Sequence, residues 1–230
     1  MTTATTLTSW ASFLGRSARD RDLIVHIYRT ACERVRSDDE AVGLKRDLTV
    51  AHTPPEAAIA ITVRPIEDRD VPRILGTDDA GLSAGEKWER ARRHRLLETG
   101  AGTCYVAVSA EDEPCYLQWL FSERDNAFLQ RYFRGSFPVL DGSTALLEDA
   151  FTPENFRGKR IMSAAMALIA ERGADVGARY VITFVGVDNA ASLKGCGRAG
   201  FSTYVHRTQR WRLFRQAISF RPAEGPVAAQ

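Results

Sequence analysis

A basic turn between an apolar strand and an apolar helix constrains the fold of this chain more than any other feature. The turn spans residues 152–160 (TPENFRGKR) and carries one glycine among three basic residues. An apolar run over residues 145–151 precedes it, and the helical pattern of residues 161–172 follows. Free N–H groups and the dipole at a helix start favour negative charge. The segment therefore predicts a phosphate or pyrophosphate site, or else an ordinary connection between a strand and a helix.

The segments after this helix continue the alternation of strands and helices. Residues 179–185 (RYVITFV) are rich in β-branched and aromatic side chains, which indicates a buried strand. Asn189 can cap a short helix that Gly200 ends, and Phe201 can begin a further strand. The predicted order is strand, basic turn, helix, strand, Asn-capped helix, Gly-Phe and strand.

This order of elements resembles the GNAT superfamily of N-acetyltransferases over residues 61–213. Residues 61–66 (ITVRPI) are similar to the family's first strand, and residues 67–70 (EDRD) to the start of its first helix. The resemblance implies an α/β (α+β) fold with a mixed, mostly antiparallel central sheet that is flanked by helices. It also implies acetyl-CoA, or another acyl-CoA, as the donor substrate.

The predicted phosphate loop departs from the family pattern at two positions. The family has Arg/Gln-x-x-Gly-x-Gly/Ala, and this chain has Arg160 at the fourth position and Met162 at the sixth. The family's Gly lets the backbone approach a pyrophosphate closely. Arg160 can supply charge to the pyrophosphate instead, or it can crowd the site and weaken CoA binding. The residues of this predicted loop are Arg157, Gly158, Lys159, Arg160, Ile161 and Met162.

The resemblance also places the rest of the donor site. In the GNAT fold the fourth and fifth strands splay, and acyl-CoA lies between them. Its amides would pair with Ala150, Phe151 and Thr152, and a backbone N–H near Phe151 would stabilise the oxyanion. Asn189 and Ser192 are similar to the family's pantetheine and helix-start positions, although each can equally be part of a helix cap.

Glu148 is the predicted general base, which removes a proton from the attacking amine. It lies in an apolar strand, where burial would raise its pKa towards neutrality. Strand alternation places the neighbouring Asp149 on the opposite face, so that only one of the two carboxylates faces the gap. The alternative is that Glu148 forms a structural ion pair.

Cys196 stands where the family often carries a Tyr that protonates the departing thiolate. A thiol near its usual pKa of about 8.5 can donate a proton. The alternative is a small residue of the buried core, which is the commoner fate of a free Cys.

The amino-acid composition limits which classes of protein this chain can belong to. The chain has 230 residues, 44% of them hydrophobic and 26% charged, and a formal net charge of +2, as in globular proteins without general nucleic-acid affinity. It has four scattered cysteines, no metal-binding pattern, no membrane-spanning run and no signal peptide. We therefore expect a cytoplasmic location, no metal and no membrane partner.

Three regions are predicted along the chain. Residues 1–60 form an N-terminal helical extension with an amphipathic helix over residues 21–36 and a polar connection through residues 44–48. The extension packs on the domain, or serves as a dimer contact or lid. Residues 61–214 form the GNAT-like domain, in which residues 103–108 and 115–121 make a hairpin and the last two strands are residues 201–205 and 209–214. Residues 215–230 form a loose tail.

Residues 83–98 read as a Ser-capped helix that is strongly basic. Its Arg90, Arg92, Arg93, His94 and Arg95 form a solvated face, or they attract an acidic acceptor or the adenosine phosphates.

The resemblance implies an acyltransferase that moves an acetyl or other short acyl group from acyl-CoA to a primary amine. The acceptor would be a small-molecule amine or an amino-acid-like compound. One alternative is an aminoacyl transferase of the same fold that takes its acyl group from a charged tRNA, the one nucleic-acid partner considered. Another is a non-catalytic domain that binds acyl-CoA.

Overall fold

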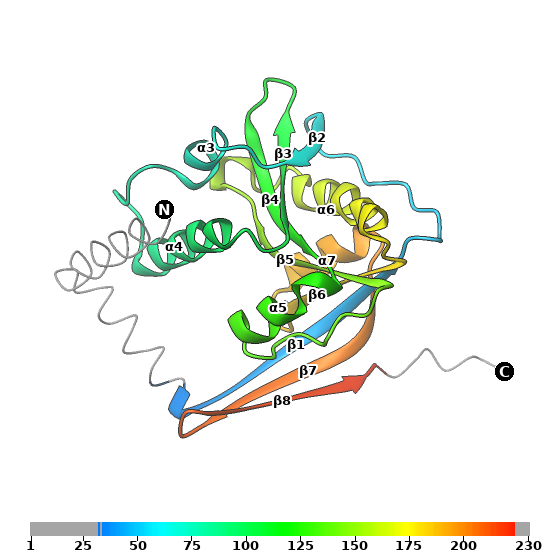
Figure 1. Cartoon of the computed structure of the whole chain (residues 1–230). Helices are drawn as coiled ribbons and strands as arrows, with labels where there is room; N and C mark the ends of the chain where they lie inside the picture. The colour runs from blue at the N-terminus through cyan, green and yellow to red at the C-terminus, as the bar shows by residue number, and fades with distance from the viewer. Residues whose placement is uncertain (1–31, 33, 224–230) are drawn as a thin grey trace, which may run out of the picture.

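The computed structural model describes residue 32 and residues 34–223, which form one sheet covered by helices (Figure 1). The described sheet has eight strands in the order β2-β3-β4-β5-β6-β1-β7-β8. Neighbouring strands are antiparallel except for β5 and β6, which are parallel. The strands are β1 (Arg36–Asp47), β2 (Ile61–Pro65), β3 (Thr103–Ser109), β4 (Pro114–Phe121), β5 (Thr144–Phe151), β6 (Tyr180–Gly186), β7 (Ser202–Arg212) and β8 (Arg215–Pro222).

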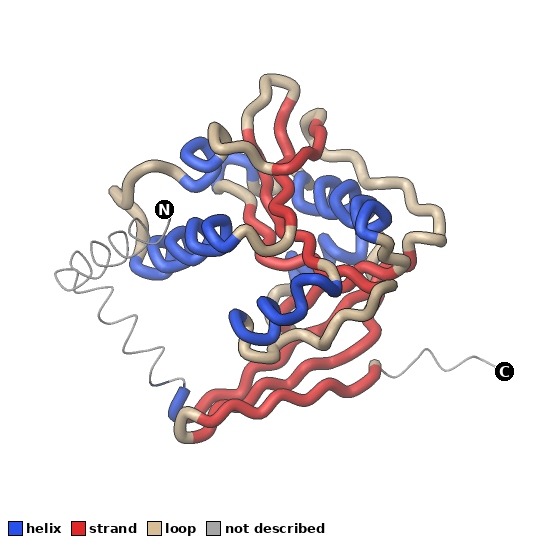
Figure 2. Tube along the Cα trace, in the orientation of Figure 1, coloured by secondary structure: helices blue, strands red, loops and turns tan. Residues whose placement is uncertain are grey.

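Helices pack on both faces of this sheet (Figure 2). The α-helices are α3 (Val71–Leu75), α4 (Ala84–Thr99), α5 (Asn126–Tyr132), α6 (Ile161–Glu171) and α7 (Ala190–Arg198), with 3₁₀ turns η1 (Glu123–Asp125), η2 (Glu154–Phe156) and η3 (Arg172–Val176). One core cluster joins the sheet to α6 and α7, through residues such as Ile161 and Cys196. A second cluster joins the other face to α3, α4 and α5, through Leu75, Leu96 and Leu129. The predicted fold class, a mostly antiparallel sheet flanked by helices, is confirmed. None of the described helices has both the length and the apolar character needed to cross a membrane.

The polar connection predicted for residues 44–48 is wrong, because Arg36–Asp47 forms strand β1. β1 lies between β6 and β7 in the sheet, so these residues belong to the same sheet as residues 61–214. Its first half is charged, and cross-strand ion pairs hold it to β7: Asp38 with Arg212 at 2.8 Å, and Asp39 with Arg207 at 3.8 Å. The predicted helix of residues 21–36 lies mostly outside the described residues. Among its described positions, residues 32, 34 and 35 are helical, and residue 36 begins β1.

The loose tail predicted for residues 215–230 is also wrong where it is described. Arg215–Pro222 forms the edge strand β8, which pairs along β7. The two strands predicted at 201–205 and 209–214 are one continuous strand, β7. Leu213 and Phe214 close the β7–β8 hairpin with left-handed φ angles of +49° and +63°. Such a two-residue turn ordinarily contains Asn or Gly, so its usual sequence signal is missing here.

Candidate functional site

Strands β5 and β6 separate after only three paired residues. They pair over Thr144–Leu146 of β5 and Tyr180–Ile182 of β6. Beyond that point, among the described strands, β5 pairs with β4 as far as Phe151, and β6 pairs with β1 as far as Gly186. The sheet therefore divides into two wings that meet at the start of β5 and β6 and splay towards their C-terminal ends.

A bulge lies in the unpaired half of β5. Trp119 of β4 is opposite Glu148, but Leu117, only two residues away, is opposite Phe151. β5 therefore carries one extra residue. Asp149 lies at this bulge with a left-handed φ of +57°, a conformation that Asp tolerates better than most residues.

The prediction that Asp149 and Glu148 point to opposite faces is wrong, because the left-handed bulge breaks strand alternation. Arg92 of α4 donates to Asp149 Oδ1 at 2.8 Å, and Arg93 Nε lies 3.2 Å from the same oxygen. Only 1% of the Asp149 side chain is exposed. α4 packs on the face of the sheet that holds Trp119, so both carboxylates lie on that face.

Three arginines of helix α4 bind partners within the protein. Arg93 lies over the Phe151 ring, 4.4 Å from its centroid, besides its contact with Asp149. Arg90 binds the carbonyl oxygens of Leu75 and Asp78 and the carboxylate of Asp79. The predicted Ser83 cap is confirmed, but a solvated face is wrong for Arg90, Arg92 and Arg93. Their partners are carboxylates and carbonyls of the protein itself.

Glu148 lies partly buried at the start of the unpaired half of β5. Burial raises its pKa to about 7, and the charge of Asp149 acts in the same direction. The Asp149 amide and the charges of Arg92 and Arg207 act in the opposite direction. Glu148 forms no ion pair with the residues that the structure describes. A carboxylate with a pKa near 7 suits a general base at neutral pH.

The residues predicted to pair with the donor follow Glu148 along the edge of the separation. Ala150 is exposed, and Phe151 and Thr152 are partly buried. The Thr152 carbonyl accepts a hydrogen bond from Arg157 Nε at 3.3 Å, which folds the turn back on the strand end.

The basic turn has an open, partly left-handed backbone. Gly158 and Arg160 have φ angles of +77° and +58°. Arg160, which replaces the family's Gly, is the N-cap residue of α6 and is exposed. It therefore has a backbone conformation that Gly adopts without strain. The Lys159 ammonium lies over the Phe156 ring, 5.1 Å from its centroid.

Met162 is accommodated by a glycine on the neighbouring helix. A Cβ atom at Gly195 of α7 would lie 2.7 Å from Met162 Sδ. The missing side chain at Gly195 thus provides the space that Met162 fills, and Ile161 beside it is buried in the core. The large residue at the sixth position of the loop is therefore compensated from α7.

Arg160→Gly should raise the free energy of unfolding by about 0.5–1 kcal/mol. A left-handed L-residue costs about 1–2 kcal/mol, and the greater freedom of Gly in the unfolded chain offsets part of the gain. Denaturant unfolding measures the change. Lys159→Gly is the control. Lys159 lacks a positive φ, so glycine at that position should lower the free energy of unfolding. Equal losses in both variants would contradict the strained turn.

The short helix α7 is capped as the sequence predicts. The Asn189 side chain accepts the backbone N–H of Ser192 at 3.0 Å. The Asn189 side chain therefore has a structural role at the helix start, and Ser192 takes part through its backbone N–H. Cys196, one turn later, is fully buried in the core on the α6–α7 face, opposite to the face that holds Glu148. Burial raises the pKa of its thiol to about 12, which makes it a weak acid.

Cys196→Ala and Cys196→Ser test whether the thiol protonates the leaving thiolate. We expect both variants to lose about 1–2 kcal/mol of stability, as for other small changes in a core, and to keep turnover per folded molecule. Turnover with a saturating amine is compared with thermal unfolding of each variant. Slowed thioester cleavage in a fully folded Cys196→Ala protein would instead establish the acid role.

Arg207 on β7 is a neighbour of Glu148 that the sequence interpretation missed. Its Nη1 donates to the Ser136 carbonyl at 3.0 Å, and its guanidinium lies 5.5 Å from the centroid of the Phe184 ring. Burial lowers its pKa, and its Nε has no hydrogen-bond partner among the described residues. The sequence carries one signal for this position. Arg207 follows the buried Val205 by two residues, and strand alternation places both side chains on the same face.

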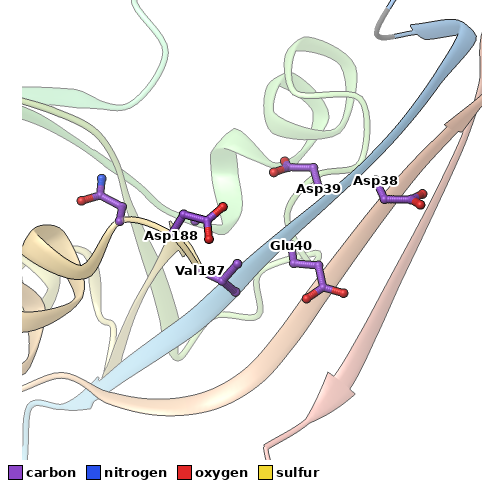
Figure 3. Close-up of a pocket in the computed structure, with 7 residues that line it drawn as sticks. Asp38, Asp39, Glu40, Val187 and Asp188 are labelled. Carbon is purple, nitrogen blue, oxygen red and sulfur yellow. The ribbon is translucent and has the colours of Figure 1, made fainter.

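An acidic hollow of about 520 Å³ lies where β1 extends past the end of β6. Figure 3 shows Asp38, Asp39 and Glu40 of β1 beside Val187 and Asp188. Arginines of β7 neutralise two of these carboxylates, through the Asp38 and Asp39 ion pairs. Within residues 34–223, no three His, Cys, Asp or Glu side chains are arranged to hold a metal ion.

The comparisons with known proteins identify the fold. No protein-family model matches the sequence, and no curated protein matches it. A GNAT-family acetyltransferase from Colwellia psychrerythraea is similar in structure, with a TM-score of 0.52, 15% identity, and coverage of 81% of this chain and 61% of that one. A functionally unknown conserved protein from Staphylococcus epidermidis ATCC 12228 has a TM-score of 0.51, 8% identity, and coverage of 81% and 66%. This chain thus spans less than two thirds of the length of either protein.

Proposed function

We propose, from the GNAT acetyltransferase fold that the described residues share, that this protein transfers an acetyl or other short acyl group from acyl-CoA to a primary amine. The observation that carries the proposal is the separation of β5 from β6 beside Glu148, whose pKa is raised to about 7. A thioester held between the two strands would lie beside a carboxylate that is ready to accept a proton. The fold alone leaves the chemistry open, whereas a carboxylate beside the separated strands is specific to this site.

The donor would lie along the C-terminal half of β5 and end at the basic turn. Ala150, Phe151 and Thr152 offer backbone groups to the pantetheine amides, and an N–H near Phe151 stabilises the oxyanion. The N–H groups at the start of α6 and the charges of Arg157, Lys159 and Arg160 attract the pyrophosphate. The exposure of Arg157 and Arg160 supports this arrangement.

Glu148 takes a proton from the amine as its nitrogen attacks the thioester carbonyl. The C–N bond forms, the C–S bond breaks, and the CoA thiolate leaves. Water supplies the proton to the thiolate if Cys196 is only a core residue. Positioning the amine and the thioester together accounts for most of the rate enhancement in such a direct transfer.

An assay of thiol release tests the proposal. The full chain is incubated with acetyl-CoA and a panel of primary amines, and free CoA thiol is measured together with the N-acyl product. We expect thiol release that depends on the amine and matches the product mole for mole. The absence of amine-dependent release with every acyl-CoA tested would contradict the proposal.

The proposed binding of the acyl-CoA donor is tested by the CoA affinity of Arg160→Gly. If Arg160 pairs with the pyrophosphate, the variant should lose about 1–3 kcal/mol of binding free energy, the scale of a charge-assisted hydrogen bond. If Arg160 crowds the site, binding should tighten. An unchanged affinity would remove this residue from the donor site.

Two features favour the tRNA-dependent alternative: the departures of the predicted phosphate loop from the family pattern at Arg160 and Met162, and the basic helix at residues 83–98. Arg90, Arg92 and Arg93 are committed to Asp79, Asp149 and backbone carbonyls, so the support from this helix is lost. Binding of aminoacyl-tRNA in the absence of CoA binding would restore it. The non-catalytic alternative predicts CoA binding without thiol release.

A further inference from the structure

The contact between helix α4 and the bulge of β5 joins three charged side chains at a buried point. Asp149 is 1% exposed, and its Oδ1 lies 2.8 Å from Arg92 Nη2 and 3.2 Å from Arg93 Nε. Glu89 Oε2 lies 2.8 Å from the same Arg92 nitrogen. The other carboxylate oxygen, Asp149 Oδ2, is buried without a hydrogen-bond partner in the described part of the chain. We name Asp149, Arg92 and Arg93 the arginine clamp.

The clamp acts on the residue that adopts the unusual backbone conformation. Asp149 has a φ of +57° in the strand that carries Glu148 and Phe151. A left-handed L-residue costs about 1–2 kcal/mol and persists where surrounding contacts enforce it. Arg92 and Arg93 both contact Asp149. Arg93 also lies over the Phe151 ring, 4.4 Å from its centroid. These contacts hold the strand on both sides of the bulge.

We propose that Asp149 is a positioning residue, held by Arg92 and Arg93, that fixes the bulge of β5 and sets the electrostatic field at the Glu148 carboxylate. This inference rests on the proposed function, in which Glu148 is the base. The clamp lies outside the reacting atoms and acts only through Glu148 and the backbone of β5.

The charges of the clamp act on Glu148 with opposite signs. Asp149 raises the pKa of Glu148, Arg92 lowers it, and Arg207 lowers it from the β7 side. The ionised fraction of Glu148 thus depends on the balance between the Asp149 carboxylate of β5 and the guanidiniums of Arg92 on α4 and Arg207 on β7. Asp149 raises the pKa of both arginines of the clamp. Among the other described residues, it also raises the pKa of Cys104 of β3, Tyr116 of β4 and Tyr132 of α5.

Two variants separate the charges while keeping the shape of the clamp. Asp149→Asn retains a left-handed preference and an oxygen that can accept from Arg92, but it removes the negative charge. We expect the pKa of Glu148 to fall by about one unit. Arg92→Gln removes one positive charge, and Arg93 still binds Asp149, so the pKa of Glu148 should rise by about one unit. Arg95→Gln removes the same charge from an exposed position on α4 and serves as the control.

The pKa of Glu148 is measured directly by NMR titration of the carbon-13-labelled side-chain carboxyl in the full chain, without substrate. Opposite shifts in the two variants, with none in Arg95→Gln, support the clamp. Shifts of the same sign, or no shift, overturn it. If Asp149→Asn does not fold, the sign of the shift in Arg92→Gln alone decides.

The pH profile of kcat separates the clamp from the proposed reaction. Where Glu148 is the base, the rising limb of the profile should move to lower pH in Asp149→Asn and to higher pH in Arg92→Gln, by the amounts seen in the titration. Titration shifts without matching kinetic shifts uphold the clamp and overturn the role of Glu148 in catalysis. A purely structural salt bridge would change the unfolding temperature and leave the pH profile in place.

Discussion

Glu148→Gln should lower turnover by about 10²–10⁴-fold, the usual cost of losing a general base, and leave acyl-CoA affinity almost unchanged. Glutamine keeps the size and polarity of the side chain, but it cannot accept the proton of the attacking amine. Steady-state kinetics with saturating amine and donor, together with calorimetry for the donor, measure the two quantities. Glu113→Gln, at an exposed position between β3 and β4, makes the same chemical change away from the site and should retain wild-type turnover.

The pH dependence gives this prediction a definite sign. The base must be ionised, so wild-type kcat should rise with pH through about 7, the raised pKa of Glu148. A carboxyl group whose pKa is raised in the folded state destabilises the fold as pH increases from its ordinary value towards the raised one. Glu148→Gln should therefore gain about 1–3 kcal/mol of stability relative to wild type at pH 8 but not at pH 4. Wild-type turnover at all pH values in Glu148→Gln would contradict the role of a base: Glu148 would then be structural, or the amine would reach the site already neutral.

Gly43→Ala should lower the free energy of unfolding by about 2–3 kcal/mol, the cost of overpacking a core. Gly43 lies in β1 between Phe184 of β6 and Val205 of β7. A Cβ atom there would lie 2.8 Å from Phe184 Cε1, and closer still to Val205 Cγ1. Thermal unfolding should show a Tm lower by roughly 5–10 °C for a domain of this size.

Gly186→Ala is the matched control for this substitution, since Gly186 lies on the neighbouring strand β6. No heavy atom lies within 4 Å of the position that a Cβ would take there. Its effect should be neutral, or stabilising by up to about 1 kcal/mol through the reduced freedom of the unfolded chain. Equal Tm values for the two variants would contradict the close packing of β1 against both neighbours.

The parts of the fold with regular apolar patterns could be predicted from the sequence. Strands β3 to β6, the capped helix α4 and the turn into α6 follow ordinary propensities. β1 could not, because its first half contains Asp38, Asp39 and Glu40 and its second half contains Gly43. Its stability comes from ion pairs and packing against β7 and β6, which only the assembled sheet provides. Tertiary context overrides local propensity here.

The candidate site was predicted in part. The position of Glu148 and its raised pKa follow from a carboxylate in an apolar strand. The bulge could not be predicted, because alternation assigned Asp149 to the opposite face and nothing local signals a left-handed Asp in a strand. The partners of Asp149 lie 57 and 56 residues earlier on α4, as Arg92 and Arg93, so the clamp depends on contacts that are remote in sequence. The spacing of Arg207 from Val205 signals an inward-facing side chain, but its approach to Glu148 also depends on contacts that are remote in sequence.

Calorimetric titration of the full chain with acetyl-CoA and with CoA tests the central claim most directly. The claim is that the separation of β5 and β6 and the predicted phosphate loop at residues 157–162 form an acyl-CoA site. We expect one-to-one binding of both ligands with micromolar dissociation constants. The absence of binding to either ligand by the folded protein would contradict the account.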